Sequence, residues 1–183
     1  MDDLGEQESE AGKEKPLEIK AEDNPWYLLA TLYGVSRQWD QELKDKNRVA
    51  WNRYFAANLD EETRTKLIKE KRHPAEELRP FSPEELREVA TAFARRRKVS
   101  ANELALPESL AEIDFSNVEF EQYAFFQDYL FGSNSSFQRA TFSDQAYFGG
   151  STYSRWANFR GVTFSAPQAP LPMCGSSRRT SLR

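Results

Sequence analysis

Residues 115–131 read FSNVEFEQYAFFQDYLF, and an aromatic residue recurs in them at nearly every fifth place. The recurrence continues as far as residue 164, with intervals that alternate strictly between five and six residues. The pattern therefore repeats at every second aromatic residue, and it holds its register along the whole segment. The aromatic residues in register are Phe115, Phe120, Phe126, Phe131, Phe137, Phe142, Phe148, Tyr153, Phe159 and Phe164.

A second regular position lies two residues before each of these aromatic residues. A helix would spread positions five apart around its axis, and a continuous strand would place them on opposite faces. A solenoid that turns a corner after each short segment sends both kinds of residue inward, so the pattern predicts a repeat architecture. The residues at this second position are mostly small or β-branched: Ile113, Val118, Ala124, Tyr129, Ser135, Ala140, Ala146, Ser151, Ala157 and Val162.

The segments IDFSNVEF, RATF, QAYF and WANFRGVTF resemble the pentapeptide-repeat proteins, in particular the Phe-centred variety written A-D-F-x-G-A-T-F in bacterial chains. The resemblance covers residues 113–165. It implies a short right-handed, quadrilateral parallel β-helix with one repeat on each side, in which the central Phe of one coil stacks on that of the next. The stacks that it implies join every fourth aromatic residue, as in Phe115–Phe137–Phe159 and Phe120–Phe142–Phe164.

Four positions depart from the family pattern. Tyr129 and Ser135 are unusual at the small position, and Tyr153 replaces a Phe. Phe125 is an additional aromatic residue where the family usually has a polar one.

The repeat stops abruptly after Phe164. Residues 166–183 are rich in Pro, Ser and Arg and contain no acidic residue, so we expect a disordered basic tail. A solenoid needs a cap at each end, because an open coil exposes unpaired strand edges and apolar side chains. Two expectations stay open for this end: that it pairs with another molecule, or that the reading frame is truncated or frame-shifted.

The first part of the chain has a different composition. Residues 1–23 carry nine acidic residues against three lysines and contain no aromatic residue, so we expect a disordered acidic leader. Residues 24–98 are predicted to form a small α-helical region, and residues 99–112 a linker into the first coil. The expected helices start at Asn24-Pro25 and stop at Gly34, cover residues 36–57 and 61–72, and run from a capping box at Ser82–Glu85 to Lys98.

Composition limits the classes of function and location. The formal net charge is −4 and the pI is about 5.3, so strong nonspecific binding to nucleic acid is not expected. Cys174 is the only cysteine, so an intramolecular disulfide is impossible and a reducing compartment is favoured. The sequence has neither a signal-peptide pattern nor an apolar window of about 18 residues, so a soluble, cytoplasmic chain is predicted.

The sequence predicts no catalytic, cofactor-binding or metal-binding residue, and no cofactor. His73, the only histidine, precedes Pro74 at a helix end and is interpreted as a solvated residue. Cys174 falls in the expected tail, and Gly149-Gly150 is interpreted as a corner rather than a phosphate loop. The basic run at residues 95–98 is interpreted as a helix C-terminus that its cations stabilise.

A repeat scaffold of this kind favours a non-catalytic role, as a protein-binding or scaffold protein. Its partner would be another protein, or a second copy bound through the open C-terminal coil end, with no membrane or nucleic acid involved. An alternative is a DNA-mimic modulator of a type II topoisomerase, although residues 113–164 carry five acids against three arginines. A further alternative is an enzyme whose chemistry lies in the helical region around Trp39, Trp51 and His73.

Overall fold

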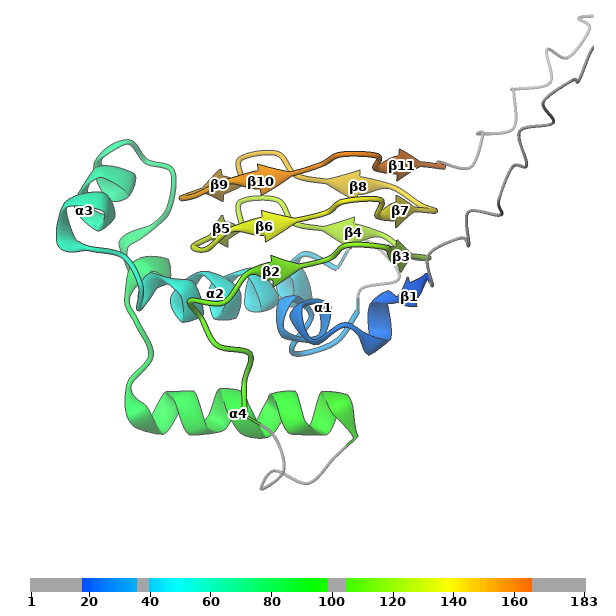
Figure 1. Ribbon diagram of the computed structural model, residues 1–183. Coiled ribbons are helices and arrows are strands. Elements are labelled where there is room, and N and C mark those ends of the chain that lie inside the picture. The colour runs from blue at the N-terminus through cyan, green and yellow to red at the C-terminus, as the bar shows by residue number, and fades with distance from the viewer. Residues whose placement is uncertain (1–17, 36–39, 99–104, 166–183) are drawn as a thin grey trace, which may run out of the picture.

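The computed structural model describes residues 18–35, 40–98 and 105–165. Most of its helices lie below a stack of short strands, which forms the upper part of the view in Figure 1, and the helix of residues 61–69 lies beside the stack. The N-terminal part of the chain is mainly helical and the part after residue 112 consists of short parallel strands. This order confirms the predicted helical N-terminal region followed by a strand repeat.

The helices begin at residues that the sequence marks as caps. Side-chain oxygens of Asn24, Asp60 and Ser82 accept hydrogen bonds from backbone N–H groups of the first turn, as predicted. Ser82 and Glu85 form the predicted capping box. The helical elements are η1 (Ala21–Asp23), α1 (Pro25–Ala30), α2 (Gln41–Ala56), α3 (Glu61–Lys69), η2 (Ala75–Leu78) and α4 (Pro83–Arg97).

Three of these helices differ from their predicted bounds by more than one residue. The first helix ends at Ala30 rather than at Gly34. The third helix ends at Lys69 rather than at residue 72, and the left-handed backbone of Lys71 follows it. The second helix starts at Gln41, where the Asp40 side chain caps it by accepting from Leu43 N–H. Residues 36–39, which the prediction included in that helix, lie outside the described residues.

The strands of the C-terminal part pair in parallel and build four separate sheets. Each strand from β2 to β7 pairs with the strand four places later in chain order, as Ile113 does with Ser135 and Phe120 with Phe142. The sheets have the strand orders β1-β3-β7-β11, β10-β6-β2, β4-β8 and β5-β9. The strands are β1 (Ile19–Lys20), β2 (Ile113–Asp114), β3 (Val118–Phe120), β4 (Ala124–Phe125), β5 (Leu130–Phe131), β6 (Ser135–Ser136), β7 (Thr141–Phe142), β8 (Ala146–Tyr147), β9 (Thr152–Tyr153), β10 (Ala157–Asn158) and β11 (Thr163–Phe164).

The chain therefore visits the four sheets in turn and then returns to the first of them. This arrangement is compatible with a β-helix-like solenoid and is not a closed barrel. We call each round of the four sheets a coil: the first covers residues 113–134, the second 135–156, and the third starts at residue 157.

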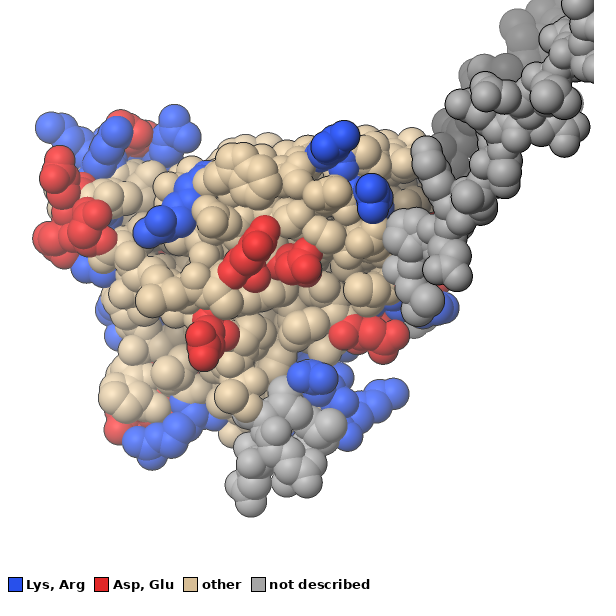
Figure 2. All heavy atoms as spheres, in the orientation of Figure 1, with Lys and Arg blue, Asp and Glu red and all other residues tan. Residues whose placement is uncertain are grey.

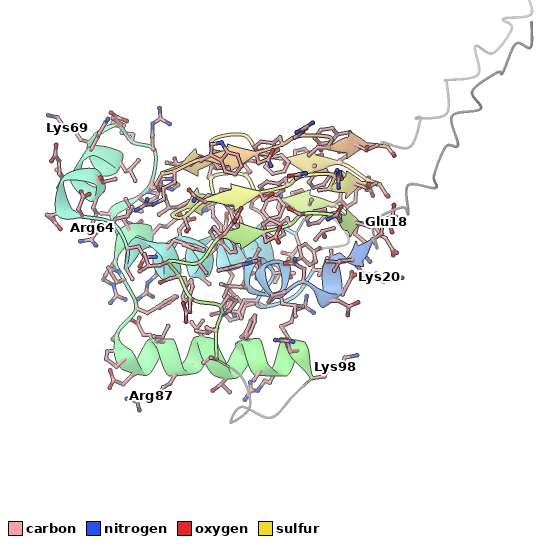
Figure 3. All side chains as sticks on the ribbon, in the orientation of Figure 1. Glu18, Lys20, Arg64, Lys69, Arg87 and Lys98 are labelled. Carbon is pink, nitrogen blue, oxygen red and sulfur yellow. The ribbon has the colours of Figure 1, made fainter. Side chains whose placement is uncertain are left out.

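Aromatic rings stack between the coils in the predicted register. In the six stacked pairs the ring centroids lie 4.6–5.3 Å apart, with interplanar angles of 3–27°. The rings fill the space between the sheets, which Figure 3 shows densely occupied by side chains. The stacked pairs are Phe115–Phe137, Phe120–Phe142, Phe126–Phe148, Phe131–Tyr153, Phe137–Phe159 and Phe142–Phe164.

Every second corner of the coils is a tight turn, and each of these turns is closed by the same type of backbone hydrogen bond, from the N–H of its fourth residue to the carbonyl of its first. In one of them the Ala140 N–H donates to Phe137 O at 2.9 Å, and in another the Ser151 N–H donates to Phe148 O at 3.2 Å. The third residue of each turn has a positive φ, as in type II turns, which favours Gly or Asn there. These residues recur at every second corner: Asn117, Asp128, Arg139, Gly150 and Gly161. Gly149-Gly150 is thus a corner, as the sequence indicated.

Residues 18–23 belong to the fold, so the prediction of a disordered leader as far as residue 23 is wrong for this part. β1 adds a parallel strand to the first coil, where Ile19 pairs with Val118 and the Ile19 N–H donates to Asn117 O at 2.9 Å. The physical reason is that β3 would otherwise present an unpaired strand edge. Figure 3 shows Lys20 at this edge, where its Nζ lies 3.3 Å from Glu121 Oε1. Residues 1–17 of the predicted leader lie outside the described residues.

The predicted linker is partly attached to the C-terminal end of α2. The Tyr54 hydroxyl donates to Pro107 O, and Asn58 Nδ2 donates to Ser109 O at 2.7 Å. Residues 99–104 of this linker and the predicted tail, residues 166–183, lie outside the described residues. Among the helices that the structure describes, none has the length and apolar character needed to cross a membrane.

Candidate functional site

The last strands of the four sheets, β8 to β11, form one end of the stack, which we call the terminal coil. Its inward aromatic residues are Phe148, Tyr153, Phe159 and Phe164. Phe159 is 41% exposed and Phe164 61% exposed, whereas Phe137 and Phe142, one coil below, are fully buried. The terminal coil therefore presents to its surroundings the same aromatic faces that the inner coils bury against each other.

The opposite end of the stack is covered by the helical region. The Tyr27 ring packs edge-on against Phe120 at 5.5 Å, and the Trp51 ring packs in the same way against Phe131 at 5.6 Å. These rings occupy the places that a preceding coil would fill. Phe55 lies so close that a Cβ added at Gly132 would come within 2.9 Å of the Phe55 Cβ, so only glycine fits there.

Side chains of α2 also replace the hydrogen bonds of a preceding strand. The backbone of Leu130 directs one donor and one acceptor away from the second coil. Its N–H donates to Asn52 Oδ1 at 2.7 Å, and its carbonyl accepts from Trp51 Nε1 at 2.9 Å. Similarly, Asn24 Nδ2 donates to Asp114 O at 2.8 Å. Buried backbone groups of the first coil are thereby satisfied without a further strand.

The terminal coil has no such cover among the described residues. β9, β10 and β11 each end their sheet in the strand order, so one edge of each is without a neighbouring strand in the part of the chain that the structure describes. The lateral face of the stack that is turned toward the viewer in Figure 2 is mostly uncharged, with scattered charges of both signs. Trp156, in the corner before β10, is 59% exposed and adds to the apolar surface of this end.

A cavity of about 150 Å³ lies between α1, α2 and the outer side of β4. Its lining includes Lys44, Arg48, Tyr123, Phe125 and Asp128. The Lys44 Nζ lies 4.5 Å from the centre of the Phe125 ring, and burial lowers the pKa of Lys44. The additional aromatic residue Phe125 therefore has an outward role: it stacks on Tyr147 of the next coil at 5.1 Å and forms one wall of this cavity.

His73 is buried, so the prediction of a solvated histidine is wrong. It is 2% exposed, with its Nδ1 3.4 Å from Asn52 Nδ2 and its Nε2 3.0 Å from Thr152 Oγ1. The misinterpretation arose because the neighbouring Pro74 marks a helix end without showing what packs on it. His73 joins the helical region to β9, although 79 residues separate it from Thr152.

His73 belongs to a buried polar network that sequence reasoning missed. The Glu77 carboxylate is 3% exposed and accepts from Arg48 Nη2 at 2.9 Å and from Asn52 Nδ2 at 2.7 Å. Asn52 also donates to Asp128 O at 3.0 Å. Burial lowers the pKa of His73, while the nearby Glu77 and Asp128 oppose that shift. Charged and polar groups of this kind are seldom buried without partners, and here each has at least one.

The other residues that the sequence singled out are placed apart from one another. Trp51 is fully buried against the first coil, and Trp39 lies outside the described residues, as does Cys174. In the basic run, Arg96 Nε donates to Thr31 O at 3.1 Å and ties the end of α4 to α1. Within residues 18–35, 40–98 and 105–165, no group of three or more His, Cys, Asp or Glu side chains is arranged to hold a metal ion.

Comparisons of the chain with protein-family models, with curated proteins and with solved structures gave no match. The inference of function therefore depends on the terminal coil, the covered end and the buried network.

Proposed function

We propose that this chain is a pentapeptide-repeat protein with a right-handed, four-sided β-helix, and that it acts as a non-catalytic protein-binding or scaffold protein. Three observations support the family and the fold. The strands recur in the same order in successive coils, they fall into four sheets, and like aromatic residues stack between coils. The cytoplasmic location predicted from the sequence is part of this proposal.

The observation that carries the binding role is the exposure of the terminal coil. Phe159 and Phe164 each stack on one buried ring and present the other side of the ring outward. β10 and β11 carry unpaired edges in the described part of the chain, and such edges can accept further strands. A protein that binds here would gain both apolar contact and backbone hydrogen bonds.

The occupant we propose is a second copy of this chain. The terminal coil of a second copy has the same four-sided outline and the same aromatic residues, so its rings can stack as those of adjacent coils do. A contact that uses one surface patch on both molecules is the usual arrangement in a two-fold symmetric dimer.

Sedimentation velocity or light scattering of the intact chain over a wide concentration range would test this role. We expect a concentration-dependent dimer in the wild type and a monomer in the double variant Phe159→Ser/Phe164→Ser. The matched control is Leu110→Ser, because Leu110 is 73% exposed but lies before the first coil.

Two outcomes would contradict the proposal. A monomer at every concentration would exclude a second copy as the occupant. A dimer that persists in the double variant, or that dissociates equally in Leu110→Ser, would place the contact elsewhere. Circular dichroism of each variant would show that the strand repeat is retained, so that unfolding is not mistaken for dissociation.

A further inference from the structure

We propose that His73 makes the contact between the helical region and the coil stack sensitive to pH: the neutral imidazole holds the α3–η2 segment against β9, and the protonated imidazole releases it. The proposal goes beyond the binding role of the terminal coil and does not depend on it. It starts from the position of the ring, which is buried and has each nitrogen beside a polar group of another element.

The orientation of the Asn52 amide fixes the protonation state of His73. Asn52 Oδ1 accepts from the Leu130 N–H, which can only donate. Asn52 Nδ2 points at Glu77 Oε2 and at the backbone carbonyl oxygen of Asp128. A carbonyl oxygen can accept a hydrogen bond but cannot donate one, and the same is true of an ionised carboxylate. The amide therefore cannot be turned over without losing all three hydrogen bonds.

His73 Nδ1 consequently faces an amide nitrogen that cannot accept a hydrogen bond and whose two hydrogens point at Glu77 and Asp128, so Nδ1 cannot act as a donor. The single proton of the neutral ring then lies on Nε2, which donates to Thr152 Oγ1 at 3.0 Å. A second proton, on Nδ1, would bring two N–H groups against each other at a separation of 3.4 Å in a buried site. The folded arrangement thus has no acceptor for that proton.

The charged groups around the ring come from several elements. Glu77 of η2 and Asp128 of the corner between β4 and β5 favour the protonated ring, whereas Arg48 of α2 and Arg72, next to His73, disfavour it. Burial is the strongest influence and lowers the pKa of His73 below its ordinary value. The closed contact therefore contains a neutral imidazole.

Proton uptake is then coupled to opening of the contact. The unfolded or opened chain binds a proton with an ordinary histidine pKa of about 6.5, whereas the closed contact binds it at a lower pH. Below about pH 6.5 the open form therefore takes up more protons than the closed form, and acid shifts the equilibrium toward opening. At neutral pH and above, the contact keeps its full strength.

NMR of the side-chain nitrogens provides a direct test, because the chain contains a single histidine and a tag-free sample gives one set of imidazole signals. We expect the Nε2–H form at neutral pH and a titration midpoint below that of a model histidine peptide. Hydrogen exchange, corrected for intrinsic rates, should show the segment from Arg72 to Leu78 losing protection as the pH is lowered from 7.5 to 5.

His73→Gln and Thr152→Val separate the ionisation from the packing. Over the same pH range, we expect the wild type and Thr152→Val to lose stability toward acid, while His73→Gln loses this part of the pH dependence. An ordinary titration midpoint with unchanged exchange in the wild type would overturn the proposal, and so would equal pH slopes in the wild type and His73→Gln. If His73→Gln does not fold, the titration and exchange of the wild type decide alone.

Discussion

The two ends of the coil stack both present aromatic rings and backbone groups of strand edges, but only the first end is covered by other described residues. At the first coil, rings of the helical region cover the aromatic ladder, and the side chains of Trp51, Asn52 and Asn24 pair with edge backbone groups. At the terminal coil, Phe159 and Phe164 are exposed. The contribution of a repeat aromatic residue to the unfolding free energy should therefore depend on whether both faces of its ring are covered.

The greatest loss of stability is expected when a covered ring is removed, and an uncovered ring of the same stack is its control. Phe142 lies between Phe120 and Phe164 and is fully buried, so Phe142→Ala should cost about 3–5 kcal/mol of unfolding free energy. Phe164→Ala removes a ring that is 61% exposed and should cost about 1 kcal/mol. Chemical denaturation of both variants measures the difference, and equal losses would mean that the terminal coil is covered.

A smaller effect is expected at the polar contacts of the covered end. Asn52→Ala leaves the buried N–H of Leu130 without a partner and removes the hydrogen bond to Glu77 Oε2, and should cost about 2–3 kcal/mol. Asn158→Ala, which removes a hydrogen bond to Gln138 near the terminal coil, should cost less than about 1 kcal/mol. Thermal unfolding of the pair would contradict this view of the two ends if the losses were similar or reversed.

The corners allow a test in which two changes have opposite signs. Arg139 has a φ of 58°, so Arg139→Gly should relieve backbone strain and stabilise the fold by about 0.5–1 kcal/mol. Gly150→Ala introduces the same strain within the terminal coil, and its Cβ would meet Asp128 Oδ1 at 1.9 Å, so it should destabilise by at least about 1 kcal/mol. Denaturation midpoints of the two variants measure both effects. Changes of the same sign would show that the corners are not equivalent.

The weakest effect concerns the attachment of α4, beneath the covered end. Hydrogen bonds from Arg53, the Ser82 N–H and Arg79 lower the pKa of Glu85 to about 2. Because this pKa is depressed, its contribution is present above the ordinary carboxyl pKa of about 4.3 and is lost as the pH falls toward 2. Glu85→Gln should therefore reduce the acid-induced loss of stability, as followed by circular dichroism. An unchanged acid profile would contradict a role for this carboxylate.

The repeat could be predicted because each coil imposes the same requirement at a fixed separation. Phe120, Phe142 and Phe164 must meet in one stack, so their spacing is visible in the sequence. The caps of three helices could also be predicted, because Asn24, Asp60 and Ser82 act within their own first turn. In both cases the information is local or periodic.

The helical region could be expected to cap the first coil, because a solenoid needs a cap. The individual contacts of the covered end could not be predicted, because they join distant residues that follow no period. Asn52 and Leu130 are 78 residues apart, and an asparagine within an apolar helix pattern does not indicate what it meets. The departures from the repeat pattern are visible in the sequence, but their physical cause is visible only in the structure. Tyr129 occupies a position that is usually small, and its hydroxyl donates to Ala30 O at 2.8 Å. Ser135, at the start of the second coil, is buried.

The constant offset along the chain between neighbouring coils has a consequence for how the protein folds. Every contact between coils closes a loop of the same modest length, so each coil can be added to the one before at a similar entropic cost. The contacts of the covered end are different, because Tyr129 reaches Ala30 across 99 residues. During synthesis the helices leave the ribosome first, and the first coil can settle on them before later coils emerge. The slow docking of the first coil on the helices would then come at the start, and growth of the stack would follow it.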